Sequence, residues 1–184
     1  IYNKNKLSIS FMAGFDQGFM YYSQKSRYDS QYYGAGLEGV IASGLSYSGE
    51  FVMERGKSYL AGNIIPGFYG YNVRKDVLAY AGQFRLNYYI NVLLKPVIMA
   101  HYAFGSGDMN RDDYRSPNAN AGGKDRGFLY FGTFVGGYAL RPLLANMHMI
   151  SGTVALSPFS WSDIYSFKNM TIMAKYMYYL KHKA

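Results

Sequence analysis

The sequence predicts an all-β protein, a transmembrane antiparallel up-and-down β-barrel of about seven or eight strands. Three observations predict this fold. Segments of about ten residues alternate between apolar and polar side chains with a period of two, as strands with two different faces do. The 184 residues include 21 Tyr and 21 Gly, which suits strands and turns better than helices. Long and short connections also alternate along the chain, as in outer-membrane barrels.

Seven segments show the alternation of a strand. They are residues 7–13, 34–43, 45–54, 76–88, 95–104, 146–157 and 167–180. The pattern is most regular in the third segment, where Tyr47 and Phe51 lie on one side and Ser48 and Glu50 on the other. In the last segment Ile172 and Leu180 share an apolar side, and Lys175 lies on the opposite side. We expect lipid to cover the apolar sides and a water-filled lumen to border the others.

The connections between these segments differ in length. We expect long connections at residues 16–33, 55–75 and 105–145, short ones at 43–44 and 89–94, and a moderate one at 158–168. Barrels of the bacterial outer membrane have short turns on the periplasmic side and long loops outside. A soluble antiparallel sheet with one face on a protein core would alternate in the same way, but it has no reason to sort its loops.

Composition narrows the class of protein further. No apolar run reaches the roughly 18 residues that a membrane-spanning helix needs, and mean hydropathy is −0.15. A β-barrel remains compatible, because only every second residue of its strands meets lipid. The chain has no cysteine, so it has neither disulfides nor thiolate metal sites. Its net charge of +8 favours anionic partners.

The strand number bears on domain organisation. Closed single-chain bacterial barrels have an even number of strands, at least eight, whereas seven segments are found. We therefore expect residues 1–184 to form a single β-barrel domain that is an incomplete segment of a longer chain. The alternative is a complete eight-stranded barrel with its additional strand in residues 18–24 or 128–138.

The passage VIMAHYAFGSGDMNRDDYRSPNANAGGKDRGFLYFGTF, residues 97–134, resembles the alginate export family of outer-membrane porins. The shared features are a strand ending near Tyr102, a Ser-Gly-Asp turn at 106–108, a polar loop and an aromatic-rich segment. Residues 36–56 and 168–180 resemble a tight hairpin and a late strand of that family. The resemblance implies a large barrel in the outer membrane of a Gram-negative bacterium, with this chain towards its C-terminal part. It also implies passive transport of a polyanionic sugar.

Strand parity selects eight candidates for lumen-facing charges. They are Arg85, Lys95, His101, Lys175, Lys181, Glu38, Glu50 and Glu54. Charged rings of this kind set the selectivity of pores. The sum of these charges is barely positive, so the residues alone do not establish a strongly anion-selective lumen.

Other chemistry is poorly supported. Asp108, Asn110 and Asp112 resemble the start of an EF-hand loop and offer an opportunistic cation site in a loop. The sixth and twelfth positions of that motif are Asp113 and Ala119 rather than Gly and Glu, so an EF-hand is not formed. Three histidines, at positions 101, 148 and 182, are too scattered to predict a metal site.

The sequence therefore predicts a porin that passes hydrophilic, anionic, polysaccharide-type solutes by diffusion. It predicts no enzymatic activity, no cofactor and no nucleic-acid binding. The expected partners are the lipid bilayer and lipopolysaccharide, anionic or polar solutes, and other outer-membrane subunits. Two alternatives stay open. One is a structural barrel that is plugged or associated with a partner protein, and the other is a small closed eight-stranded barrel acting as an enzyme.

Overall fold

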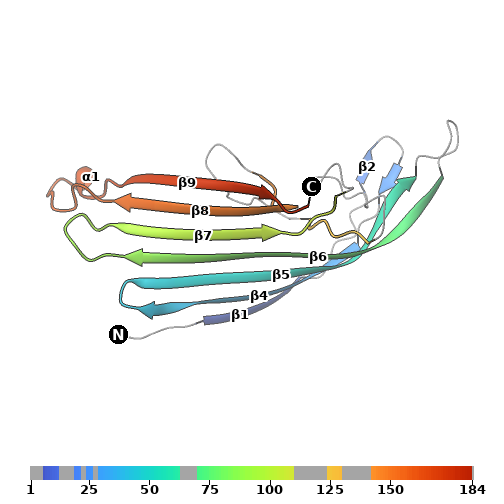
Figure 1. The fold of residues 1–184 in the computed structure, drawn as a ribbon, viewed down its shortest axis with the longest axis horizontal. Coiled ribbons are helices and arrows are strands. Elements are labelled where there is room, and N and C mark those ends of the chain that lie inside the picture. Colours follow the sequence, from blue (N-terminus) through green and yellow to red (C-terminus); the bar gives the residue numbers. More distant parts are fainter. Residues whose placement is uncertain are drawn as a thin grey trace.

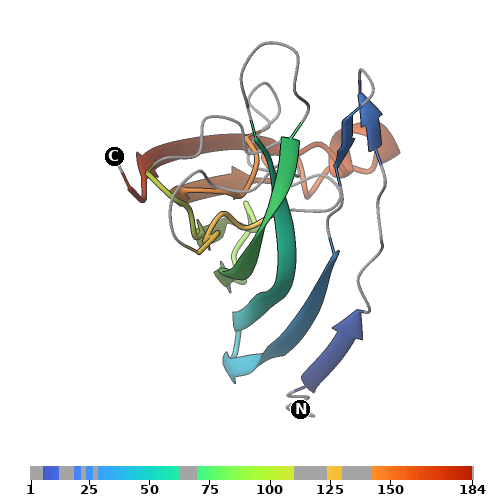
Figure 2. The ribbon, with the colours of Figure 1, turned by 90° about the vertical axis from the view of Figure 1, so that its right-hand side faces the viewer.

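A computed structural model of the chain describes residues 6–12, 19–21, 24–26, 29–62, 70–109, 124–129 and 142–183. Seven strands form one antiparallel sheet in the order β1-β4-β5-β6-β7-β8-β9 (Figure 1). Their bounds are β1 (Lys6–Met12), β4 (Asp29–Ala42), β5 (Leu45–Gly62), β6 (Gly70–Tyr89), β7 (Val97–Gly105), β8 (Met147–Leu156) and β9 (Ile172–Lys181). The all-β, up-and-down antiparallel prediction is confirmed. The sheet is open, with β1 and β9 at its two edges (Figure 2).

The remaining elements are short. β2 (Phe19–Tyr21) and β3 (Gln24–Ser26) pair only with each other, and α1 (Tyr165–Lys168) precedes β9. Of residues 18–24, a candidate for an eighth strand, the described residues 19–21 and 24 belong to this separate pair and not to the main sheet. Of the other candidate, 128–138, Phe128 and Leu129 are not in a strand and the rest lies outside the described residues. No helix in the described part of the chain is long and apolar enough to cross a membrane.

The predicted long connection at 55–75 is wrong. β5 continues to Gly62 and β6 begins at Gly70, so that the two strands are 18 and 20 residues long. Residues in this stretch instead pair across the two strands as far as Gly62↔Gly70. Lys57 faces Asp76 in the register, and their side chains form an ion pair of 2.9 Å. Cross-strand pairs of opposite charge stabilise the pairing of two strands.

The predicted start of the last strand is also corrected. Residues 165–168 form the helical turn α1, and β9 begins at Ile172. The connection between β8 and β9 lies at the same end of the sheet as the turns 43–44 and 90–96 (Figure 1). It contacts the second of these turns, where the Ser157 N–H donates to the Leu94 carbonyl oxygen at 2.8 Å. The described parts of the longer connections 13–28 and 106–146 lie at the opposite end.

The tight turn between β4 and β5 requires a glycine. Gly44 has a φ of +77°, and a Cβ at this position would lie 2.2 Å from the carbonyl oxygen of Tyr89. We expect Gly44→Val to destabilise the protein by about 1–3 kcal/mol, because it combines a disfavoured backbone conformation with a steric clash. Urea unfolding measures the loss. Ser43→Ala, in the same turn, is the control, and equal effects of the two substitutions would contradict the prediction.

The strand register assigns each residue to one of two faces. Cross-strand partners share a face, and neighbours along a strand alternate. The pairs Glu50↔Gln83, Gln83↔Ala103 and Ala103↔Met149 define what we call the inner face. The other side of the sheet is called the outer face.

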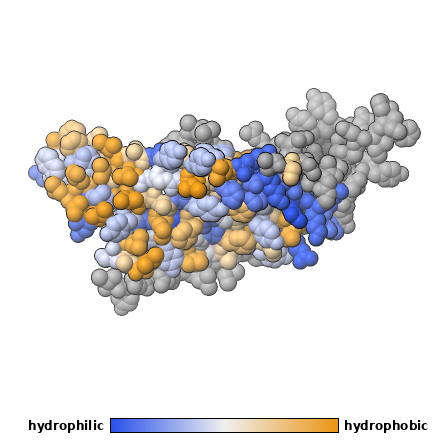
Figure 3. All heavy atoms as spheres, in the orientation of Figure 1, coloured by the Kyte–Doolittle hydropathy of each residue, from blue (hydrophilic) through white to orange (hydrophobic). Residues whose placement is uncertain are grey.

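Large apolar side chains are exposed across the outer face. The exposed set there is Tyr33, Leu37, Ile41, Phe51, Phe84, Tyr88, Ile98, Tyr102, Ile150, Val154, Leu156, Ile172, Tyr176, Tyr178 and Leu180. In Figure 3 hydrophobic residues cover much of the left and centre of the visible surface, and a hydrophilic area lies towards the right. No described segment covers this apolar set.

The hydrophobic core is small and lies on the inner face. It contains Tyr32, Ala79, Ala81, Ala103, Phe128, Leu144, Met147 and Met149. Three alanines from β6 and β7 leave room above the sheet, and Phe128 and Leu144 from the β7–β8 connection occupy it. The Tyr32 and Phe128 rings meet edge to face at 6.0 Å. The core therefore joins the sheet to a connection folded against it.

Candidate functional site

Charged side chains of the inner face line up across the sheet. One row of paired residues runs Glu38, Ser48, Arg85, His101, Ser151 and Met177. Adjacent strands are about 4.8 Å apart, so Glu38 and Arg85, two strands apart, are separated by roughly 10 Å at the backbone. The register thus places a carboxylate, a guanidinium and an imidazole at one level of one face.

The two signs of charge are separated. The exposed carboxylates Glu38 and Glu50 belong to β4 and β5, and Gln83 Nε2 donates to Glu50 Oε2 at 3.1 Å. The basic groups come from the other half of the sheet. They are Arg85 on β6, His101 on β7, and Lys175 and Lys181 on β9. A hydrated solute beside this face would meet an acidic side and a basic side.

Glu54 lies on the predicted face, but it is fully buried. Its Oε1 accepts a hydrogen bond from the Tyr32 hydroxyl at 2.9 Å, and its Oε2 accepts one from the Leu129 N–H at 2.9 Å. The Tyr32 hydroxyl also lies 3.0 Å from the Leu129 carbonyl oxygen. Glu54 therefore does not present its charge at the surface of the face. It holds residues 124–129, which we call the inner segment, against the sheet.

Asp125 anchors the other end of the inner segment. Its backbone forms two hydrogen bonds with β6. The Asp125 N–H donates to the Asp76 carbonyl oxygen, and the Leu78 N–H donates to the Asp125 carbonyl oxygen, each at 2.9 Å. Its carboxylate is fully buried. One oxygen accepts from the Ser58 hydroxyl at 3.2 Å and the other from the Gly127 N–H at 3.0 Å. Buried carboxylates need such partners, so these contacts specify where the segment lies.

Ser106, just after β7, connects the inner segment to the sheet. The Ser106 N–H donates to the Tyr80 carbonyl oxygen, and the Tyr80 N–H donates to the Ser106 hydroxyl oxygen, each at 2.8 Å. The hydroxyl donates to the Arg126 carbonyl at 2.8 Å, and the Ser106 carbonyl accepts from Phe128 and Asn146. The Ser-Gly-Asp turn singled out in the sequence is thus the hub of this packing. Gly105 permits it, because a Cβ there would lie 2.2 Å from the Leu144 carbonyl oxygen.

The remaining predicted site residues have other positions. Lys95 is not on a strand: it lies in the turn before β7 with a φ of 44° and is exposed, because the chain reverses there. The Asp108 carboxylate accepts a hydrogen bond from the Arg126 N–H. Asn110 and Asp112 lie outside the described residues. Within the described residues no group of three or more His, Cys, Asp or Glu could hold a metal ion.

Two histidines that looked unrelated in the sequence meet on the outer face. His148 Nε2 and His182 Nδ1 are 3.0 Å apart, and the Tyr102 hydroxyl lies 2.8 Å from His148 Nδ1. Two neutral imidazole rings satisfy this series of hydrogen bonds if Tyr102 donates to His148 and His148 donates to His182. The rings lie 34 positions apart in sequence, so only the pairing of β8 with the end of β9 reveals the contact.

This contact predicts a local response to pH. Burial, then His148 and Lys183, lower the pKa of His182 from its usual 6.5. The unfolded end therefore binds a proton more readily than the folded end. The contribution of neutral His182 to the stability of the folded end is present above pH 6.5 and is lost as pH falls through the lowered pKa. We expect the His182 and Lys183 amides, which bond to Asn146, to lose hydrogen-exchange protection at pH 5 relative to pH 7.5. A His182→Gln variant that kept the same pH dependence would contradict this.

Searches of protein families, curated proteins and solved structures found no match to this chain. What the chain does is therefore argued from its own geometry.

Proposed function

We propose that this sheet forms part of the wall of an outer-membrane channel, through which hydrophilic, anionic solutes diffuse in a water-filled lumen. The observation that carries the proposal is the burial pattern of β8. There the apolar Ile150, Val154 and Leu156 are exposed, whereas the polar Ser151 and Thr153 are buried. A protein surrounded by water favours the opposite arrangement.

The outer face supports a lipid environment. Each fully buried Val, Leu, Ile or Phe side chain gains about 1.5–3 kcal/mol relative to exposure. The exposed set therefore represents a large unfavourable contact with water unless hydrocarbon covers it. Exposed apolar areas of this extent mark membrane or protein contacts.

The two edges of the sheet set a further requirement of the proposal. In lipid every backbone N–H and C=O needs a hydrogen-bond partner, so spanning sheets close into barrels. Further strands must then pair with both β1 and β9. This requirement agrees with the resemblance to the alginate export porins, whose barrels are larger than seven strands.

The inner face supports passage of charged solutes. Exposed acidic groups on β4 and β5 lie on the same face of the sheet as exposed basic groups on β6 and β9. Charges that line a pore act strongly on a solute at close distance. Basic residues on the inner face, Arg85, Lys175 and Lys181, outnumber the exposed acids Glu38 and Glu50, which favours anions.

One observation favours the alternative of a plugged barrel. The inner segment and Leu144 lie on the inner face, where they cover Met147 and Met149. A lumen filled by such segments would leave no path for solute.

Planar-bilayer recording of the full-length protein, folded in detergent, tests the proposal and the alternative together. A channel gives discrete, steady current steps proportional to voltage. A folded protein that inserts without current would support the plugged barrel. A polypeptide that stays folded and monodisperse in buffer without detergent would overturn the membrane assignment itself.

A further inference from the structure

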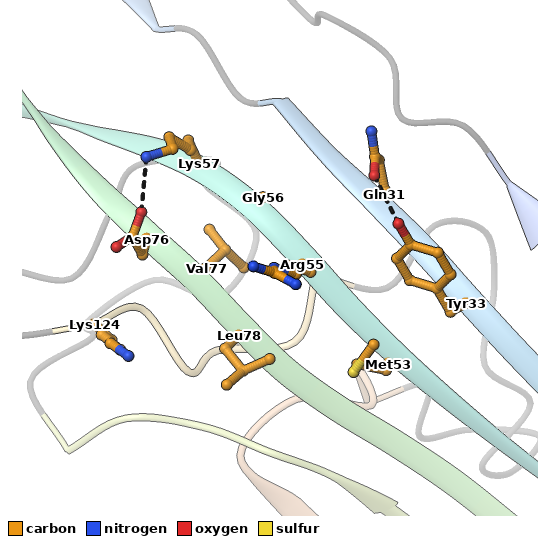
Figure 4. Close-up of a pocket in the computed structure, with 10 residues that line it drawn as sticks. All are labelled: Gln31, Tyr33, Met53, Arg55, Gly56, Lys57, Asp76, Val77, Leu78 and Lys124. Atoms are coloured by element: carbon orange, nitrogen blue, oxygen red, sulfur yellow. Dashed lines mark hydrogen bonds and ion pairs between the residues drawn. The ribbon is translucent and has the colours of Figure 1, made fainter.

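A hollow of about 650 Å³ lies on the outer face at one end of the exposed apolar set, beside the ion pair of Lys57 with Asp76 (Figure 4). Its volume is within the usual range for small-ligand sites. Tyr33, Met53 and Leu78 provide apolar walls, and Arg55, Lys57 and Lys124 provide positive charge. The hollow thus combines cations with a hydrophobic lining.

The register explains how the cations meet. Arg55 and Lys57 are two positions apart on β5, so both project from the outer face. Arg55 pairs with Leu78 and Lys57 with Asp76 on β6. On the far side of β6, Asp125 is held by backbone hydrogen bonds and turns its carboxylate to the inner face. Alternation then places Lys124 on the outer face.

The hollow carries a net positive charge. Asp76 is the one carboxylate among its described lining residues, and Lys57 forms an ion pair with it at 2.9 Å. Three cations against one carboxylate leave an excess of two positive charges. A guanidinium beside ammonium groups suits phosphate oxygens, which Arg binds in a bidentate manner and Lys binds as a point charge.

The position of the hollow indicates where such a phosphate would come from. Aromatic residues border the hollow on the side of the other exposed apolar residues: Tyr80 pairs with the lining residue Met53, and its ring is stacked on Phe51 at 5.9 Å. Aromatic rings mark the boundary between hydrocarbon and headgroups in membrane barrels. Long loops of bacterial barrels lie outside, so this end of the sheet would face the outer leaflet.

We propose that Arg55, Lys57 and Lys124 bind a phosphate group of the outer leaflet's phosphorylated glycolipid, with its apolar part against Tyr33, Met53 and Leu78. The inference rests on the proposed membrane position of the sheet, and adds a specific lipid partner to it. The contacts are non-covalent, and the site lies on the opposite face of the sheet from the solute path.

Lipid A carrying both phosphates is the probe. The full-length protein is delipidated in detergent, lipid A is added, and native mass spectrometry measures the bound fraction. We expect the triple variant Arg55→Gln/Lys57→Gln/Lys124→Gln to bind lipid A at least about tenfold more weakly, because it loses the hydrogen bonds between three cationic side chains and the phosphate. The control Lys95→Gln/Lys168→Gln removes exposed lysines from the opposite end of the sheet, and should bind as the parent does.

Four further measurements separate the outcomes. Lipid A without phosphates should bind as weakly to the parent as the triple variant binds lipid A; equal binding of both lipids to the parent would overturn the proposal. Displacement of lipid A by an equal concentration of inorganic phosphate would overturn the glycolipid source.

If the triple variant does not fold, Lys124→Gln alone should weaken binding several-fold, and no change would count against the site. Bilayer insertion of each variant is checked separately, so that a failed membrane assignment is recognised as such.

Discussion

Replacing Glu54 with alanine is expected to release the inner segment from the sheet and to enlarge the single-channel conductance. The substitution removes the acceptor of the Leu129 N–H, whereas the Tyr32 hydroxyl loses Glu54 but keeps the Leu129 carbonyl as an acceptor. Hydrogen bonds to a charged group contribute about 1.5–3 kcal/mol each, so the equilibrium between attached and detached segment should shift by at least about tenfold. Hydrogen exchange at Phe128 and Leu129 reports detachment, and planar-bilayer recording reports conductance.

Two variants make this prediction specific. Glu54→Gln keeps one carbonyl oxygen as an acceptor, so its effect should be intermediate. Glu50→Ala removes a carboxylate from the same strand and face, but Glu50 bonds to Gln83 rather than to the inner segment. It should leave exchange at Leu129 unchanged. Unchanged exchange at Leu129 in Glu54→Ala would show that the carboxylate does not hold the segment.

Reversing two inner-face charges is expected to reverse the ion preference of the channel. In Arg85→Glu/Lys175→Glu each substitution changes the charge by two units. A unit charge at roughly 8 Å in water contributes on the order of 0.5 kcal/mol before salt screening. The four units together should lower the ratio of anion to cation permeability by on the order of tenfold. Reversal potentials in asymmetric KCl measure this ratio.

The turn residue Lys95 provides the matched control. Lys95→Glu makes the same change of charge at an exposed position off the strands, and should alter the reversal potential far less. Screening explains the difference, because charges beyond about 10 Å of the solute path interact weakly at 0.1 M salt. Equal effects of Lys95→Glu and the double variant would argue against a water-filled path along the inner face.

Alternation was a good guide to the sheet and to its faces. Parity predicts that Arg85, His101 and Lys175 lie on one face, and the strand register confirms it for all three. The same argument failed for Lys95, because a pattern of period two says nothing about where a turn ends and a strand begins. The long connection expected at 55–75 is wrong as well, because β5 and β6 stay paired as far as Gly62 and Gly70.

The inner segment could not be predicted. Leu129 and Glu54 are 75 positions apart, and Asp125 and Ser58 are 67 apart. Neither contact follows a local rule, and a buried carboxylate looks like a solvated one in sequence. Ser106, the hub of the packing, was noticed only through the resemblance of its turn to a porin family.

The basic hollow shows the same limit. Arg55 and Lys57 share a face by alternation, but Lys124 joins them only because Asp125 pairs with the edge of β6 at Val77.

The sequence by itself determined seven strands, their antiparallel order and the division of their side chains between two faces. The faces follow from local alternation, and short connections leave β4 with β5 and β6 with β7 little choice of partner. Only the tertiary structure decided which charges are buried, which segment covers the inner face and which cations gather on the outer face. Those features depend on contacts between distant residues, whose free energies are set by burial and hydrogen bonding rather than by position in the chain.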